Sequence, residues 1–230
     1  MKTGHGRRGS SLPGGERLEA EQQETLGGQG RETSTPLDAA TSGRLEVLGG
    51  VSRLFIHAAP SLLDLYRARF TGPLPDIRVR NGTVTIQFLH PYARHRSDHT
   101  ADIALNASIP WQIGVRGGVS DLDADLSGLQ LGSLDVGEGA NRIELTLPQP
   151  DGTHAVGIAG GANTVIVHRP VGVAVRLRVR GGIAAVLLDG RRYTSQGGDT
   201  LLETPDDGGA ATHYDIAFRG GANSLTVDTR

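Results

Sequence analysis

Gly160-Gly161-Ala162-Asn163-Thr164-Val165-Ile166-Val167 is the stretch that decides the fold, because close copies of it recur along the chain. The copies align on the second residue of a pair that is usually Gly-Gly. The seven aligned residues are Gly50, Gly82, Gly118, Gly139, Gly161, Gly182 and Gly221. Self-similarity of this kind predicts that one structural unit is used several times.

Apolar residues occupy alternate positions on both sides of each aligned glycine. Around Gly161 they are Val156 and Ile158 before the corner, and Val165 and Val167 after it. A period of two is typical of half-buried strands, whose side chains point to opposite faces in turn. Each unit is therefore predicted to be a strand, a glycine corner and a second strand, with glycine supplying a positive φ or a close backbone approach. A phosphate-binding loop would instead lead into an amphipathic helix.

The corners between residues 118 and 182 are spaced 21, 22 and 21 residues apart. A constant period of this length favours a β-solenoid, in which each unit stacks on its neighbours. An antiparallel meander with Gly-Gly hairpins is also permitted by the alternation. Asn141, Asn163 and Asn223 recur two residues after an aligned glycine. They could form a ladder of stacked amides or serve each turn locally.

The composition divides the chain into two parts. Residues 1–40 are rich in Gly, Glu, Gln, Ser and Thr and lack sustained periodicity, so we predict a disordered tail. Residues 41–230 are predicted to form one all-β repeat domain. The repeat is interrupted at residues 60–75, predicted as a loop ending in a strand, and at residues 191–209. No obvious cap follows the last unit, and exposed solenoid ends invite self-association into homo-oligomers.

Charge and composition restrict the possible partners and locations. A net charge of −2 and an aromatic content of 4% argue against nucleic acid as a partner. With no cysteine there is no disulfide, thiol nucleophile or cysteine-ligated zinc site. No stretch is apolar enough to span a membrane, and no apolar export segment follows Arg7 and Arg8. We therefore expect a protein of the cytoplasm, or one held peripherally at the inner face of the envelope.

Two polar clusters suggest metal sites at first sight. His90, His95 and His99 lie in a polar, basic stretch, and histidine is the commonest transition-metal ligand, but their spacing fits no zinc motif. Another cluster consists of Asp121, Asp123 and Asp125, which would begin a calcium loop if glycine and glutamate stood where the chain has Leu126 and Gly132. We interpret both clusters as solvated and expect no metal or cofactor.

A third cluster is basic. Arg176, Arg178 and Arg180 share the outward face of a strand whose other face is apolar. They could bind an anion or a partner, although a solvated face is the interpretation that the sequence favours. If acidic and basic stripes of neighbouring units meet, cross-strand pairing is their role.

The repeated Gly-Gly-Ala-Asn unit over residues 44–230 resembles the toastrack or head-domain-like adhesin repeats of bacterial proteins, in which Gly-Ala-Ser or Gly-Ala-Asn recurs in each rung. The resemblance implies a right-handed β-helix or stacked-sheet fold without established enzymatic activity. It also implies a role in surface binding or in envelope-stress signalling.

No catalytic constellation is present in the sequence. A G-x-S-x-G nucleophile motif is missing, and no pair of carboxylates repeats on one face as a carbohydrate-active β-helix enzyme would need. We therefore predict a non-catalytic scaffold or interaction module with a protein partner. A self-assembling structural protein that forms filaments or arrays is the alternative.

Overall fold

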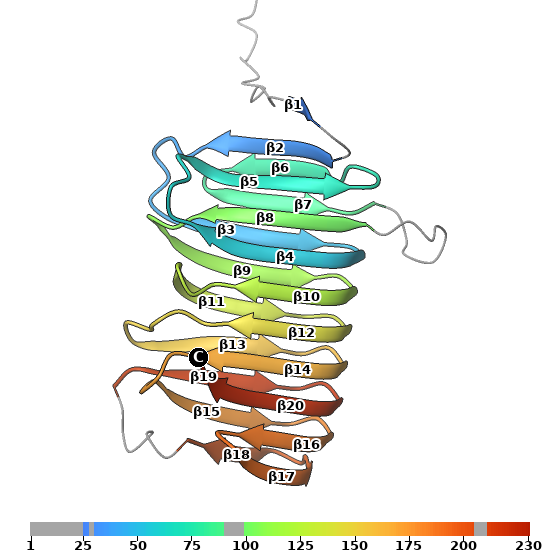
Figure 1. Cartoon of the computed structure of the whole chain (residues 1–230), viewed down its shortest axis with the longest axis vertical. Coiled ribbons are helices and arrows are strands. Elements are labelled where there is room, and N and C mark those ends of the chain that lie inside the picture. Colours follow the sequence, from blue (N-terminus) through green and yellow to red (C-terminus); the bar gives the residue numbers. More distant parts are fainter. Residues whose placement is uncertain (1–24, 28–29, 90–98, 205–210) are drawn as a thin grey trace, which may run out of the picture.

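The computed structural model describes residues 25–27, 30–89, 99–204 and 211–230, and its regular elements are β-strands (Figure 1). They form an 11-stranded sheet, here called sheet A, and a nine-stranded sheet, sheet B. In spatial order, sheet A contains β1 (Thr25–Gly27), β2 (Gly30–Pro36), β5 (Asp64–Thr71), β8 (Thr100–Asn106), β4 (Val51–Ala59), β10 (Val119–Asp125), β12 (Ala140–Thr146), β14 (Ala162–Arg169), β20 (Ala222–Thr229), β16 (Ile183–Leu188) and β17 (Arg191–Gln196). Sheet B contains β18 (Thr200–Glu203), β15 (Ala174–Val179), β19 (His213–Phe218), β13 (Thr153–Ile158), β11 (Gln130–Val136), β9 (Pro110–Arg116), β3 (Gly43–Leu48), β7 (Thr83–Gln87) and β6 (Asp76–Arg80).

Most strands come in pairs, one strand in sheet B followed along the chain by one in sheet A. Neighbouring pairs run parallel to each other in both sheets. The seven pairs stack in the order β7/β8, β3/β4, β9/β10, β11/β12, β13/β14, β19/β20 and β15/β16. The all-β prediction is confirmed, and parallel pairing rules out an antiparallel meander for these strands.

The order of the pairs in space differs from their order in the chain at both ends of the stack. The pair β7/β8 lies outside β3/β4, and the final pair β19/β20 lies between β13/β14 and β15/β16. The C-terminus therefore lies beside the stack and away from its end (Figure 1).

The expectation that the last unit leaves an uncapped end is wrong. The predicted interruption at residues 191–209 supplies two antiparallel strands, of which β17 covers β16 and β18 covers β15. At the opposite end, β5 and β6 cover β8 and β7 in the same way. Self-association through an end stays a prediction.

The inward side chains of the paired strands form one apolar core. Among the alternating apolar positions of the seven aligned units, the incompletely buried ones are Ile77 and Val79, both before Gly82. Two of the largest buried side chains have their polar atoms bonded: Trp111 Nε1 donates to the Asn106 carbonyl (2.8 Å) and Tyr214 donates to the Pro148 carbonyl (2.8 Å).

Six of the seven aligned glycines connect a strand of sheet B to a strand of sheet A, and Gly82 does not. Asn81 and Gly82 have φ angles of 48° and 74° and close an antiparallel hairpin between β6 and β7. The prediction of a repeat corner at Gly82 is therefore wrong. Asn-Gly is the preferred dipeptide of tight hairpin turns, which need a positive φ at both positions.

The steric demand at the corners falls on the glycine before the aligned one. A Cβ added to Gly181 would lie 1.7 Å from the Gly220 carbonyl oxygen, whereas one added to Gly182 would meet nothing within 4 Å. A Cβ at Gly160 or Gly220 would likewise lie 2.1 Å from the backbone of the next corner. Of the two explanations offered by the sequence, close backbone approach therefore applies at these corners.

The recurring asparagines lie side by side, because Ala140, Ala162 and Ala222 before them are in register. Asn223 Nδ2 donates to Asn163 Oδ1 at 2.5 Å. One step of the amide ladder is thus formed between β14 and β20.

Strand β2 lies within the range that the sequence predicts to be disordered, and the prediction is wrong for this segment. It pairs antiparallel with β5, and Glu32 forms ion pairs with Arg67 (3.5 Å) and Arg69 (3.0 Å). Only Thr33 of this strand is buried. A strand that is held by its backbone and by polar side chains leaves no apolar period in the sequence.

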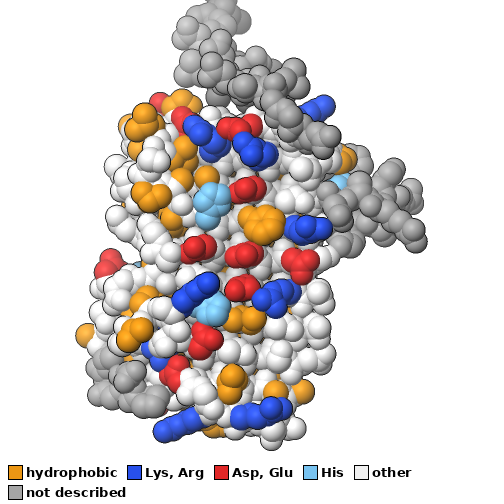
Figure 2. Space-filling view, in the orientation of Figure 1, with side chains coloured by type: hydrophobic (Ala, Val, Ile, Leu, Met, Phe, Trp, Pro, Cys, Tyr) orange, Lys and Arg blue, Asp and Glu red, His pale blue; other side chains and the backbone are white. Residues whose placement is uncertain are grey.

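Acidic and basic side chains mix on the outer face of sheet A, which Figure 2 shows. On β10, Asp121 stands in register between Arg53 and Arg142 of the neighbouring strands. Asp123 stands in register with Glu144, and its pKa is raised by partial burial first and then by the charges of Glu144 and Asp125.

We expect Gly181→Ala to lower the free energy of unfolding by about 1–3 kcal/mol, because the new methyl group must push the adjacent corner away. Gly182→Ala is the matched control in the same dipeptide and should stay within about 0.5 kcal/mol of the wild type. Urea unfolding measures both. Equal effects of the two substitutions would contradict the close approach.

We expect Asp123→Asn to raise the urea midpoint at neutral pH. Because the pKa of Asp123 is raised in the folded protein, its ionised form opposes folding at neutral pH, and this cost vanishes below its ordinary pKa of 3.8. The advantage of the variant should therefore disappear as the pH falls below that value. Asp121→Asn, flanked by arginines, should lower the midpoint. A lower neutral midpoint for Asp123→Asn would show that the pKa shift is misassigned.

Candidate functional site: an arginine groove on sheet B

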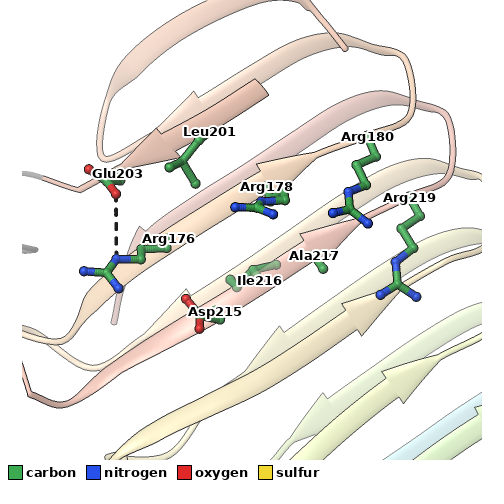
Figure 3. Close-up of a pocket in the computed structure, with 9 residues that line it drawn as sticks. All are labelled: Arg176, Arg178, Arg180, Leu201, Glu203, Asp215, Ile216, Ala217 and Arg219. Atoms are coloured by element: carbon green, nitrogen blue, oxygen red, sulfur yellow. Dashed lines mark ion pairs between the residues drawn. The ribbon is translucent and has the colours of Figure 1, made fainter. Parts of the chain in front are cut away.

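A hollow of about 500 Å³ lies on the outer face of sheet B, near the end of the stack (Figure 3). It crosses β18, β15 and β19, which are neighbours in the sheet. The lining residues are Arg176, Arg178, Arg180, Leu201, Glu203, Asp215, Ile216, Ala217 and Arg219.

The local sequence explains why the arginines face outward. In β15, Val175, Leu177 and Val179 are fully buried, so the alternate residues Arg176 and Arg178 lie on the opposite face. On β19, Tyr214, Ile216 and Phe218 are buried, and the alternate residues Asp215 and Ala217 lie on the outer face. The buried side chains of β15 and β19 thus direct Arg176, Arg178, Asp215 and Ala217 toward the groove.

The strand registers order the groove into three rows. In the first row, Arg176 stands between Glu203 and Asp215. The second row consists of Arg178 between Leu201 and Ala217. In the third row, Arg180 and Arg219 follow the last residues paired between β15 and β19, and Figure 3 shows both side chains extending over the same face.

Positive charge is concentrated at the third row. Arg176 is balanced by Glu203 at 3.7 Å, whereas Arg178 and Arg180 share one carboxylate, Asp199, at 3.9 and 3.2 Å. Arg219 has no carboxylate partner among the residues that the structure describes. This end of the groove therefore has three guanidinium groups for one carboxylate, an arrangement that can hold a carboxylate, phosphate or sulfate.

A buried histidine, His213, lies beside the first row, in register with Ala174. The ring of His213 lies 3.4 Å from the Asp215 carboxylate and 3.3 Å from Arg176. These contacts connect β15 to β19, and they leave Arg176 less available to a ligand than the arginines of the other rows.

The structure brings the predicted arginine stripe together with residues that the sequence analysis missed. Leu201 lies on β18, Asp215 lies on β19 and Arg219 directly follows β19, so all three come from segments that are distant from β15 in the sequence. One signal was present: Arg180 and Arg219 both stand two residues before an aligned glycine. If the strand pairs stacked in the order of the sequence, however, the corner after β13 would lie beside the corner after β15. Arg180 would then stand next to Ala159 and not next to Arg219.

The other predicted clusters lie elsewhere. His90 and His95 fall outside the described residues, and the His99 backbone amide donates to Ser52 Oγ at 3.3 Å. Asp121, Asp123 and Asp125 lie on the outer face of sheet A, away from the groove. In the part of the chain that the structure describes, no group of three or more His, Asp or Glu residues could hold a metal ion. Those same residues include no helix long and apolar enough to cross a membrane.

Among solved structures, a protein from Clostridium sporogenes ATCC 15579, named a "putative cell adhesion protein", resembles this chain with a TM-score of 0.72. The two are 19% identical over 87% of this chain and 99% of that one, a similarity that shows the shared fold. A "putative adhesin" from Bacteroides fragilis NCTC 9343 is 10% identical over 86% of this chain and 95% of the other, with a TM-score of 0.35. No curated protein matches.

A family model matches more than half of the chain, from residue 28 to residue 168. Its description is the N-terminal domain of toast_rack, DUF2154. The match starts just before β2 and ends in β14. The chain therefore belongs to the toast_rack family, as the Gly-Gly-Ala-Asn repeats predict.

Proposed function

We propose that this chain is a non-catalytic interaction module that binds a partner protein through the arginine groove of sheet B. The observation that carries the proposal is the excess positive charge at Arg178, Arg180 and Arg219. Arg178 and Arg180 share Asp199, and Arg219 has no carboxylate partner among the described residues. Cationic side chains gathered on one surface attract an anionic partner and speed its association.

The stacked strand pairs are, in this proposal, the coils of a right-handed β-solenoid. Alternation between the two sheets and the parallel pairing of successive neighbours support the solenoid. The handedness rests on the resemblance to toastrack repeats. A stacked scaffold of this kind presents side chains at fixed spacings on rigid outer faces, which suits a binding surface.

The structural relative from Clostridium sporogenes is named for cell adhesion, which is a binding role. Its name supports an interaction module over an enzyme, and it supports a link to the bacterial envelope. The location of this chain in the cytoplasm or at the inner envelope face stays a prediction.

The double substitution Arg178→Glu and Arg219→Glu tests the proposed function. We expect the wild-type chain to capture a partner from extracts of its native cell, and the variant to retain it at least about tenfold less well, because opposite charges become like charges. Quantitative mass spectrometry of the captured proteins gives the measurement.

The matched control is Arg191→Glu with Arg192→Glu, which changes the charge equally on exposed residues of β17 in sheet A. It should capture the partner as the wild type does. Thermal unfolding establishes that both variants are folded. If the groove variant and the wild type capture the same proteins equally, the groove is not the binding surface.

A further inference from the structure

We propose that the groove binds an extended acidic segment of a partner protein, with carboxylates at two alternate residues and a basic residue at the next alternate position. This inference rests on the proposed function and specifies the chemistry of the partner.

The spacing of the arginines along β15 favours an extended peptide. Arg176, Arg178 and Arg180 occupy alternate positions, and alternate residues of a strand lie about 6.6 Å apart. Alternate side chains of an extended peptide have the same spacing. A peptide lying along β15 can therefore place successive side chains opposite the three rows.

The charges of the rows set the pattern of the peptide. One carboxylate of the peptide would lie opposite Arg180 and Arg219, and a second would lie opposite Arg178. In the first row, Glu203 and Asp215 flank Arg176, so a basic or neutral side chain of the peptide fits there. Leu201, which is 48% exposed, offers an apolar contact beside the second row.

The third row is electrostatically incomplete without a ligand. Arg180 and Arg219 lie next to each other just beyond the paired ends of β15 and β19, where like charges oppose folding. Arg180 Nε donates to Asp199 Oδ1 at 3.2 Å, whereas Arg219 has no carboxylate partner in the described part of the chain. A carboxylate from a partner would pair with Arg219 and relieve the repulsion. Sites of this kind cost stability when empty.

The lining argues against other anionic partners. None of its residues is aromatic, so the groove lacks a platform for sugar rings. Glu203 and Asp215 would repel a polymer or a membrane that carries negative charge throughout. Two carboxylates followed by a basic residue fit better than continuous negative charge.

Fluorescence anisotropy with the full chain at low salt tests the proposal. The probe is a labelled heptapeptide with glutamates at its second and fourth residues and lysine at its sixth. Its isomer has the same composition but adjacent glutamates, which point to opposite sides of an extended chain. We expect the alternating peptide to bind at least about fivefold more tightly, and Arg178→Glu with Arg219→Glu to abolish the difference.

A single substitution separates this role from a structural one. Arg219→Gln should weaken binding of the alternating peptide about fivefold or more while raising the melting temperature of the free protein. Arg191→Gln, on β17 of sheet A, should change neither. A lower melting temperature for Arg219→Gln would overturn the argument that the third row is incomplete.

Other binding measurements show whether the ligand belongs to a different chemical class. Equal affinity for the two peptides would overturn the proposal, and so would tighter groove-dependent binding of an oligouronate or of phosphatidylglycerol vesicles. If those results came while the groove variant still lost its native partner, the acidic segment would be wrong and the proposed function would stand. If the groove variant kept its native partner, the proposed function would fail as well.

Discussion

Close contact between the backbones of neighbouring strand pairs at the corners is the constraint on which both sheets depend. At Gly160, Gly181 and Gly220 an added Cβ would lie within about 2 Å of the next corner, so only hydrogen fits there. This approach lets the backbone amides of Ala162 and Ala222 donate to the glycine carbonyls of the adjacent corners, at 2.8 and 2.9 Å. The corners thereby continue the hydrogen bonding of the sheets and keep the inward residues of successive pairs in register.

The strands, the corners and the buried positions could be predicted because each depends on residues near one another in the sequence. The order in which the pairs stack could not be predicted from the sequence. The inward faces of β13/β14 and β15/β16 are equally apolar, so β19/β20 can pack between them as well as after them. Local alternation is also the same for a corner and a hairpin. At Gly82 the preceding Asn81 decides, since both residues accept a positive φ.

The candidate site depends on the spatial order of the strand pairs. Arg180 and Arg219 occupy the same slot of the repeat, but they are 39 residues apart and become neighbours only because the last pair is inserted. The opposite wall comes from β18, in a stretch where the repeat is interrupted. A sequence pattern can therefore identify an outward arginine stripe, while the groove around it depends on topology.

The core decides how much unfavourable charge the outer face can carry. Placing Arg219 beside Arg180 costs about 0.2–1 kcal/mol, and solvent screening reduces that cost for exposed side chains. On the same strand, Tyr214, Ile216 and Phe218 are almost completely buried, and each such side chain contributes about 1.5–3 kcal/mol. The inward face of β19 therefore outweighs the outward repulsion several-fold. Because the fold does not depend on the groove charges, those positions are free to serve a partner.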